Sequence, residues 1–525
     1  MSEDREQQPT IWSESELPRR QPEVPGSAPA PQPPARFQAV NRQQMVWRAV
    51  DVEQLLEPEH LARAIWEMTG HLNLTRYTAE VRAVEGAAGR AAIDPRVLIS
   101  LWVYAYSERV SSAREVERRC AYHPAYLWLT GCEAVNHHTL SDFRVDHQEA
   151  LDNLFAQLLA MLSREGLITL EQVAHDGTKV KAGASGQSFH REKTVQEHLE
   201  AAQERVRAMG DPREEAADRR TQAARQRAAR EKVERLEQAV EELKKVQAAP
   251  EGRAEPGERR VSETDPEARI MKQADGGSAA SHNVQISTDT AHGIIVGASV
   301  TQEASDQKQL GPAGEEVERQ NGRAPGQILV DEGYTTRENI LAAAERGWDL
   351  MGGTLQPDRQ AQERRWQRRG VEPGFYPEQF RYAAASNSYT CPAGKELPYR
   401  TTQKDRVGVG YAVYRARPAD CRGCPLRAGC QPGKSGRRIV RTENAPTVAA
   451  YVAKMQTAAA RAAYRRRGPV AEFSNLWLKT KLGLRQFCVR GLRKARCEVL
   501  WACMTYNIQQ WFRLRWKPRL AQAAA

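Results

Sequence analysis

The chain has 525 residues, of which 40% are hydrophobic and 27% are charged, and its formal net charge is +11. This length predicts roughly two to four domains, well beyond the size at which core burial limits folding. No stretch approaches the ~20 apolar residues of a membrane span. The acidic start, Met1–Glu6, lacks the apolar region of a secretory signal. We therefore expect a cytoplasmic protein with no membrane partner.

Residues 1–40 are rich in Pro, Gln, Glu and Arg, a composition that cannot bury a core, so they are predicted to be a disordered lead-in. Residues 41–166 show helical spacing instead, as at Leu98, Leu101 and Trp102. This pattern predicts an all-α N-terminal domain. Its short helices carry several arginines and could form a helix-turn-helix that reads DNA. A plain packing domain is the alternative.

Residues 167–354 alternate between β-type and helical patterns, which predicts an α/β fold with a mixed sheet and flanking helices. The expected strands are Gln172–Ala182, His282–Thr290, Gly293–Thr301, Gln327–Val330 and Asp349–Gly352. The expected helices are Gln307–Asn321 and Thr336–Arg346. A helical insertion over residues 187–265 interrupts this core. Its apolar residues follow 3- and 4-residue steps, which is typical of a helical hairpin with coiled-coil character.

Residues 355–445 form a second insertion that contains a cluster of cysteines with the spacing C-x29-C-x2-C-x5-C. These cysteines are Cys391, Cys421, Cys424 and Cys430. Four thiolates suit a tetrahedral zinc ion, and the alternative is reduced thiols without metal. The other five cysteines stand in apolar helical patterns and are predicted to be small buried side chains. They are Cys120, Cys132, Cys488, Cys497 and Cys503. This usage is typical of an intracellular protein rather than of a disulfide framework.

Residues 446–525 are predicted to be helical and strongly basic. From Arg437 to Ala525 there are nineteen Lys and Arg residues against three acids, Glu443, Glu472 and Glu498. Such a block is typical of a protein that contacts a phosphate backbone. A merely solvated basic face is the alternative. We favour a nucleic-acid partner.

Three acids stand where a metal site could use them. Asp176 and Asp331 lie at or near the ends of β-type segments, and Glu472 lies on the basic helical segment. Hard metal ions such as Mg²⁺ bind carboxylate oxygens and can drive chemistry on phosphates. Each acid could also be an ordinary surface carboxylate, and Glu498 on the last helix competes with Glu472 for the third place.

Several short stretches resemble the DDE-type transposases of bacterial insertion sequences, and their order along the chain strengthens the resemblance. The closest branch is the one numbered eleven-eighty-two, related to the fourth and fifth insertion-sequence groups. The stretches are Asp176–Ala182, Asp265–Arg269, His282–Gln285, Asp331–Tyr334, Arg490–Leu492 and Tyr506-Asn507. The resemblance covers roughly residues 45–512. It implies a ribonuclease-H-like core with one Asp on the first strand, one just after the fourth strand, and a Glu on a later helix.

Carried over by position, these acids are Asp176, Asp331 and Glu472, which would bind two Mg²⁺ ions, with Mn²⁺ as a possible substitute. Related transposases show Tyr-x2-Arg-x3-Glu-x6-Lys around the last acid. Here the interval from Arg467 to Glu472 is one residue longer, while the interval from Glu472 to Lys479 matches. Seven residues make about two helical turns, so Glu472 and Lys479 share a face. The DNA contacts are expected from four basic residues, Arg467, Lys479, Arg485 and Arg490. Glu332 departs from the family pattern and adds charge beside Asp331.

The resemblance implies metal-dependent cleavage at the ends of an insertion sequence, followed by attack of the freed 3′ hydroxyl on target DNA. The expected partners are the terminal inverted repeats, the target DNA and a second copy of the chain during the reaction, and the expected location is the nucleoid. A catalytically inactive, zinc-stabilised DNA-binding protein derived from a transposase is the main alternative. A coiled-coil scaffold and a nuclease of the same fold that does not transpose are two others.

Overall fold

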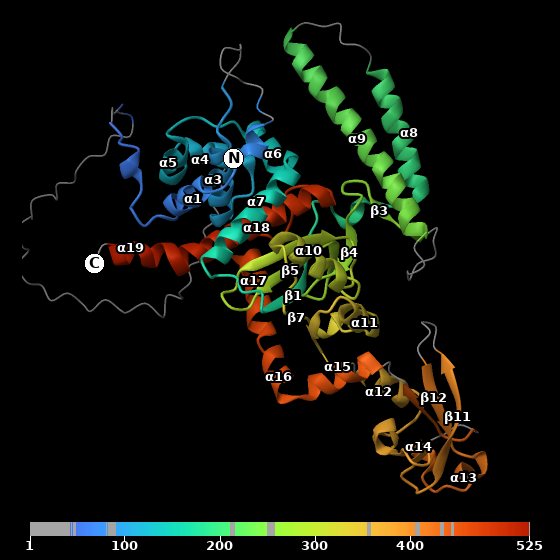
Figure 1. Cartoon of the computed structure of the whole chain (residues 1–525). Coiled ribbons are helices and arrows are strands. Elements are labelled where there is room, and N and C mark those ends of the chain that lie inside the picture. The colour runs from blue at the N-terminus through green and yellow to red at the C-terminus, as the bar shows by residue number, and fades with distance from the viewer. Residues whose placement is uncertain are drawn as a thin grey trace, which may run out of the picture. The chain divides into compact units, whose positions relative to one another are not determined.

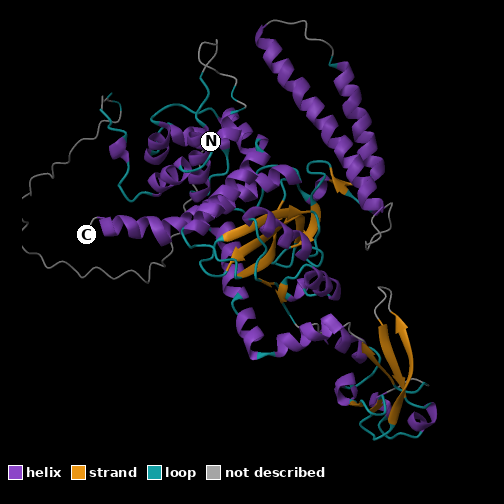
Figure 2. Cartoon of the chain, viewed as in Figure 1, coloured by secondary structure: helices purple, strands orange, loops and turns teal. Residues whose placement is uncertain are grey.

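The computed structural model of the chain describes residues 43, 45, 49–79, 81, 91–209, 216–248, 258–353, 359–404, 410–430, 435–442 and 446–523 (Figures 1 and 2). The expected disordered lead-in over residues 1–40 lies outside these ranges. Within them, no helix combines the length and the apolar character that crossing a membrane requires.

The described residues from Glu53 to Arg164 form helices and the turns between them. The elements are η1 (Glu53–Leu55), α1 (Leu61–Gly70), α2 (Thr75–Thr78), α3 (Pro95–Ser107), α4 (Ala113–Cys120), α5 (Pro124–Thr130), α6 (His137–Asp146) and α7 (Gln148–Arg164). Local sequence explains where they begin. The Asp94 side chain accepts a hydrogen bond from the Arg96 N–H, and Pro95 occupies the first turn of α3, where no partner for its nitrogen is needed.

A mixed sheet follows these helices. Its strands are β1 (Gln172–Lys181), β4 (Arg269–Lys272), β5 (Ser278–Asp289), β6 (Ile295–Thr301), β7 (Gln327–Leu329) and β8 (Asp349–Met351). The order is β4-β5-β1-β7-β8, and β6 also pairs with β5. The pairings of β5 with β1, β4 and β6 are antiparallel, whereas β1–β7 and β7–β8 are parallel. The sequence predicts five of these strands within a few residues and misses β4.

Four helices cover this sheet. Helices α10 (Leu310–Asn321) and α18 (Leu492–Trp511) pack on β6, α11 (Arg337–Glu345) packs on β8, and α17 (Arg467–Thr480) packs on β1 and β5. Helix α18 also packs on α3 and α7, so one hydrophobic cluster runs from the N-terminal helices to the sheet. After α18 the chain continues through a π-helical turn, η7 (Phe512–Trp516), into α19 (Lys517–Ala523).

Three of the motif stretches hold α18 in this position. The backbone N–H groups of Gly491 and Leu492, at the start of α18, donate to Asp265 Oδ1 at 3.2 Å and to Glu267 Oε2 at 2.8 Å. Carboxylates at a helix N-terminus satisfy its free N–H groups and its dipole. Farther along the helix, the Asn507 amide accepts from the Ile295 N–H at 2.9 Å and donates to the Ile295 carbonyl at 2.8 Å. These stretches therefore have a structural role.

Two further segments depart from this core. Strand β2 (Phe189–His190) pairs with β3 (Val261–Ser262) at the base of α8 (Glu192–Ala208) and α9 (Ala216–Ala248), which lie along each other (Figure 1). Val195, Leu236 and Leu243 are buried between these two helices, at the apolar spacing that predicts the hairpin. The short 3₁₀ turn η2 (Gly186–Ser188) precedes β2.

The cysteine-bearing segment contains a second sheet that the sequence does not predict. Its strands are β9 (Arg381–Ala383), β10 (Ser388–Thr390), β11 (Glu396–Lys404), β12 (Gly410–Arg415) and β13 (Arg438–Thr442), paired antiparallel in chain order. The helices around it are α12 (Arg359–Gln367), η5 (Pro373–Phe375), η6 (Pro377–Gln379), α13 (Pro418–Arg422) and α14 (Arg427–Cys430). The chain returns to the first sheet through α15 (Pro446–Gln456) and α16 (Ala458–Tyr464).

The expectation that five cysteines are small buried side chains is correct for Cys120, Cys497 and Cys503 and wrong for Cys132 and Cys488, which are exposed. Cys132 follows the left-handed Gly131 that ends α5, and Cys488 lies in the loop before α18. The apolar periodicity near Cys132 belongs to α5, which ends before this residue, and the periodicity near Cys488 belongs to α18, which begins after it.

Candidate active site

The sheet places Asp176 beside Asp331. Strands β1 and β7 are parallel neighbours, and their last paired residues are Ala174 and Leu329. Each acid lies two residues beyond its member of that pair, so the register carried forward sets the two acids side by side. Asp331 lies two residues after the end of β7 and caps η4 (Glu332–Tyr334), where it accepts from the Glu332 N–H at 2.7 Å.

Arg467, the first residue of α17, lies between the two acids. One guanidinium nitrogen, Nη2, is 3.7 Å from Asp176 Oδ1 and 3.6 Å from Asp331 Oδ1. The Arg467 side chain is only 13% exposed, whereas that of Asp331 is 55% exposed. Burial raises the pKa of Asp176, and the Arg467 charge partly offsets this effect. The guanidinium therefore supplies the positive charge that allows two carboxylates to stand so close together.

Helix α17 presents a second contact to Asp176. The Asn475 amide donates to Asp176 Oδ2 at 3.3 Å, and the neighbouring Ser474 hydroxyl accepts from Thr288 on β5 at 3.0 Å. Glu472 lies three residues before Asn475, hence on the same helix face and one turn away. Its side chain is exposed. Among the described residues, Glu472 forms no hydrogen bond or ion pair with either aspartate.

The structure thus brings together two of the three expected acids and leaves the third one turn away. Within the described ranges, no group of three or more His, Cys, Asp or Glu side chains is arranged to hold a metal ion. The competitor, Glu498, is in a different environment. It is 2% exposed and accepts from the Cys488 N–H at 3.1 Å. Burial raises its pKa, with Arg144 opposing the shift. Glu498 therefore acts inside the core, and its contacts with Cys488 and Arg144 include neither aspartate.

Positive charge lines β1 next to Asp176. Lys479 is largely buried on α17, and its pKa is lowered, first by burial and then by the charges of Lys179 and Arg485. Arg485 donates through Nε to the Lys479 carbonyl at 3.3 Å, and Arg490 donates through Nε to the Gly183 carbonyl at 3.3 Å. Lys179, which the sequence does not single out, lies in the same stretch as Asp176 but on the opposite face of β1, where its ammonium is 3.2 Å from Asp306 Oδ1.

The four clustered cysteines line one small cavity, together with Arg437. All four are free and partly buried. Arg437 is 2% exposed, donates to the carbonyls of Cys430 and Phe375, and lies over the Trp366 ring at 4.6 Å from its centroid.

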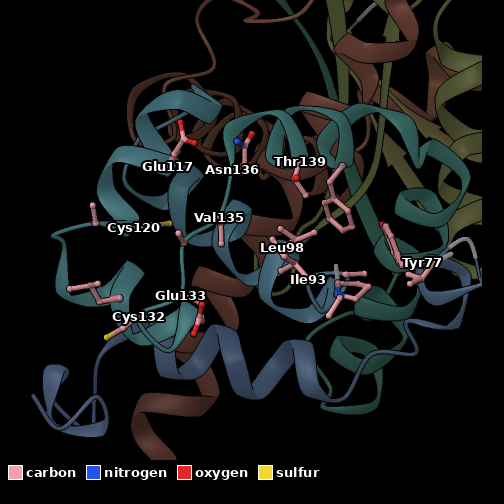
Figure 3. A pocket seen from close by; sticks show the side chains of 18 of the residues that line it. Tyr77, Ile93, Leu98, Glu117, Cys120, Cys132, Glu133, Val135, Asn136 and Thr139 are labelled. Carbon is pink, nitrogen blue, oxygen red and sulfur yellow. The ribbon is translucent and has the colours of Figure 1, made fainter. Parts of the chain in front are cut away.

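A larger cavity than this one lies elsewhere. It occupies about 760 Å³ among the N-terminal helices and is bounded mainly by apolar side chains such as Tyr77, Ile93, Leu98 and Val135 (Figure 3). Every residue that lines it falls between Tyr77 and His147, so neither the acids nor the cysteine cavity belongs to it.

Comparison with known proteins yields two family matches. Residues 390–512 match the family described as Transposase DDE domain, and residues 50–146 match the family described as Transposase domain (DUF772). No curated protein and no solved structure gives a significant match. The first segment contains Arg467, Glu472 and Lys479, and the second contains most of the N-terminal helices. These matches support a transposase, and the first suggests an enzyme that cleaves DNA.

Proposed function

We propose that this chain is a DDE transposase that cuts the ends of an insertion sequence and joins them to target DNA, with Asp176, Asp331 and Glu472 as its metal-binding acids. The observation that carries this proposal is the meeting of Asp176 and Asp331 around Arg467. It occurs beneath α17, which lies inside the segment that matches the Transposase DDE domain.

The strand order supports a ribonuclease-H-like core. With the short β4 set aside, the sheet contains β1, β5, β6, β7 and β8, and β1, β7 and β8 run parallel. Asp176 is on the first of these strands, Asp331 directly follows the fourth, and Glu472 is on a later helix. This is the arrangement that the resemblance to DDE transposases implies, and the hairpin and the cysteine-bearing segment would be insertions in it.

The residues of the pocket fit a divalent ion. Carboxylate oxygens are the donors that Mg²⁺ and Mn²⁺ prefer, and a cation, Arg467, already stands between two of them. Ions bound there would activate water and stabilise the oxygens of a phosphate under attack. Arg467 has to withdraw from at least one aspartate, and Glu472 has to turn inward from its exposed position. Asn475 holds Asp176 from the other side and limits the directions in which its second oxygen can point.

The basic residues around the pocket would hold DNA. Lys479 and Arg485 lie along one side of Asp176 and would contact the phosphates next to the cleaved bond. Arg490 would extend this contact, and Arg467 would bind a phosphate once it leaves the aspartates. The N-terminal helices are proposed to bind the terminal repeats. Because two ends must be cut together, we propose at least a homodimer during the reaction.

The test is cleavage of DNA that carries the genomic flanks of the reading frame, in the presence of Mg²⁺. We expect Asp176→Ala, Asp331→Ala and Glu472→Ala each to lose cleavage by about a hundredfold or more, as for other charge-stabilising groups. Glu345→Gln, an exposed acid at the end of α11, is the matched control and should cleave normally. Full activity in any one of the three alanine variants removes that acid from the site.

A catalytically inactive DNA-binding protein derived from a transposase is the alternative function. It predicts that the wild type binds the end-containing DNA as tightly as the alanine variants do, and that neither nicks it. Products in which an end is joined to a second DNA exclude both this alternative and a nuclease that does not transpose.

We also propose that Cys391, Cys421, Cys424 and Cys430 hold a structural zinc ion. A zinc ion with four thiolates carries two net negative charges, and the buried Arg437 guanidinium would offset part of this charge. The Lys395 N–H donates to the Cys391 sulfur at 3.3 Å, which favours a thiolate there. The sulfurs would have to draw closer together than they are in this structure, where no three of them are arranged for an ion.

The small size of the second sheet explains why such an ion would be useful. Its fully buried apolar cluster consists of Phe380, Leu397, Ala412, Tyr414, Ala416 and Ile439. A core this small stabilises a fold weakly, and metals are a common reinforcement. We expect one zinc per chain by elemental analysis, lost in Cys421→Ser and retained in the control Cys132→Ser. Less than one zinc per two wild-type chains would contradict the proposal.

A further inference from the structure

The face of the sheet opposite Asp176 carries a buried layer of polar side chains. Successive residues of a strand point to opposite faces, so His175 and Gly177 face away from the pocket that contains Asp176. On the antiparallel neighbour β5, Ser287 pairs with His175 and Gln285 pairs with Gly177. His175, Gln285 and Ser287 are each at most 3% exposed. Burying such groups is unfavourable unless they are hydrogen-bonded, so their partners define what the layer does.

Gln285 is the centre of this layer. Its amide oxygen accepts from the Tyr334 hydroxyl at 2.6 Å and from His175 Nε2 at 2.9 Å. Its amide nitrogen donates to Asp306 Oδ1 at 2.8 Å. Because an amide oxygen only accepts, His175 must carry its hydrogen on Nε2 and use Nδ1 to accept from Ser287, 2.8 Å away.

Asp306 fixes which way the Gln285 amide points. Besides Gln285, it accepts from the Asn283 amide at 2.7 Å and from the Lys179 ammonium at 3.2 Å. A carboxylate at this place can only accept, so a flipped Gln285 amide would set oxygen against oxygen. The carbonyl of Gln285 is therefore held towards Tyr334 and His175.

Two of these partners are close in sequence to the catalytic acids. Tyr334 follows Asp331 by three residues and is fully buried at the end of η4, while His175 directly precedes Asp176. We infer that Gln285 is a positioning residue of the active site: through Tyr334 and His175 it ties the loop of Asp331 to the strand of Asp176. The catalytic part of this inference rests on the proposed function, whereas the tie itself does not.

The space around Gly177 supports this assignment. A Cβ atom at this position would lie 2.5 Å from Asp306 Oδ1, 2.6 Å from Gln285 Nε2 and 2.9 Å from the Tyr334 hydroxyl. The network therefore occupies the place that a side chain next to Asp176 would take, and it contacts the backbone of β1 directly. Movement of Gln285 would therefore press on β1 beside Asp176 and, through the Tyr334 hydroxyl, on the loop of Asp331.

Two variants and a matched control test this inference. Tyr334→Phe deletes one hydroxyl and leaves the ring in place, and Gln285→Leu removes the centre of the network at nearly constant volume. Tyr77→Phe is the control, since it is also a buried tyrosine, but its hydroxyl has no hydrogen-bond partner among the described residues. The first measurement is amide hydrogen exchange of residues 331–336 in the full chain without DNA. Loss of one hydrogen bond should speed their exchange about fivefold in Tyr334→Phe.

The second measurement is the Mg²⁺ concentration that gives half-maximal DNA cleavage. It should rise about fivefold in Tyr334→Phe relative to both the wild type and Tyr77→Phe at equal thermal stability, because the two acids are less well aligned for the ion. A merely structural role would lower stability without moving this value. Unchanged exchange at residues 331–336 in both variants overturns the inference, whatever the activity. If exchange is faster in the variants but the wild type does not cleave DNA, the hydrogen-bonded link between the Asp331 loop and β1 is supported and the proposed function is refuted.

Discussion

Replacement of Gly177 by alanine tests the packing behind the acids most directly. The new methyl group would approach three polar atoms at 2.5, 2.6 and 2.9 Å, whereas ordinary contact begins at 3.4 Å. Each of these atoms would have to retreat by about 0.5–0.9 Å. Tyr334 and Gln285 are buried and hydrogen-bonded to each other, so they cannot move that far and keep the bond between them.

The expected magnitude follows from these losses. Overpacking a full site costs about 1–3 kcal/mol, and each of two lost hydrogen bonds costs about 1 kcal/mol. Alanine in place of glycine recovers about 0.4–1 kcal/mol by restricting the unfolded chain. We therefore expect Gly177→Ala to lower the free energy of unfolding by about 2–5 kcal/mol. A domain of ordinary stability, about 5–15 kcal/mol, remains folded after such a loss.

Urea unfolding measures the stability change, and cleavage of end-containing DNA at saturating and limiting Mg²⁺ measures the functional change. The matched control is Gly186→Ala, since no atom lies within 4 Å of the Cβ that this substitution adds. The control should remain within about 0.5 kcal/mol of the wild type. If Gly177→Ala also remains within that margin and cleaves DNA like the wild type, the network does not fill the space that we assign to it.

Three further outcomes follow from the geometry. Arg467→Met removes the cation between Asp176 and Asp331 and should tighten Mn²⁺ binding by about tenfold or more while slowing DNA cleavage; calorimetry that shows unchanged affinity would separate Arg467 from the ion site. Lys479→Ala should reduce the slope of log affinity against log salt by about 0.9 in a DNA-binding titration, and an unchanged slope would mean that Lys479 contacts no phosphate. Burial raises the pKa of Glu498, so the folded chain holds this proton more tightly and stability falls as pH rises through the raised pKa. The unfolding free energy of Glu498→Gln minus that of the wild type should therefore increase from about pH 4 to about pH 8. A difference that does not change with pH would contradict the raised pKa.

Much of the first sheet and its helices follows from local pattern. The predicted strand Gln172–Ala182 corresponds to β1, Gln172–Lys181, and the predicted helix Gln307–Asn321 begins three residues late, at Leu310. Strand β4 was missed because it is short and only one of its residues, Met271, is buried. Two features hide the second sheet from the sequence. Its strands β9 and β10 have three residues each, too few for alternation to show, and its longer strand β11 has only one buried residue, Leu397.

The same distinction between local pattern and tertiary contact applies to the residues of the candidate site. Asp176 and Asp331 can be predicted because each belongs to a recognisable stretch at a strand end. Asn475 and Asp306 carry no such signal, since each is a single polar residue whose place depends on how α17 and the segment before α10 dock on the sheet. Gln285 belongs to a stretch that supports the family resemblance, but its hydrogen bonds to Tyr334 and Asp306 arise only from strand register. Sequence spacing shows neither of these bonds.

The position of Arg467 has a geometric cause in the helix itself. Four residues between an arginine and the last acid, rather than the usual three, separate them by five positions on α17. At 3.6 residues per turn this is a rotation of about 140°, whereas the usual spacing gives about 40°. The arginine and the acid therefore cannot point into one pocket together while the first turn of α17 is intact. Arg467 occupies the pocket in this structure and Glu472 is exposed. Under the proposed function, a bound metal ion would favour the opposite choice, because it would supply the charge that the guanidinium now supplies and Glu472 would offer it an oxygen donor. The extra residue would thus make Arg467 and the proposed ion competitors for the same two aspartates.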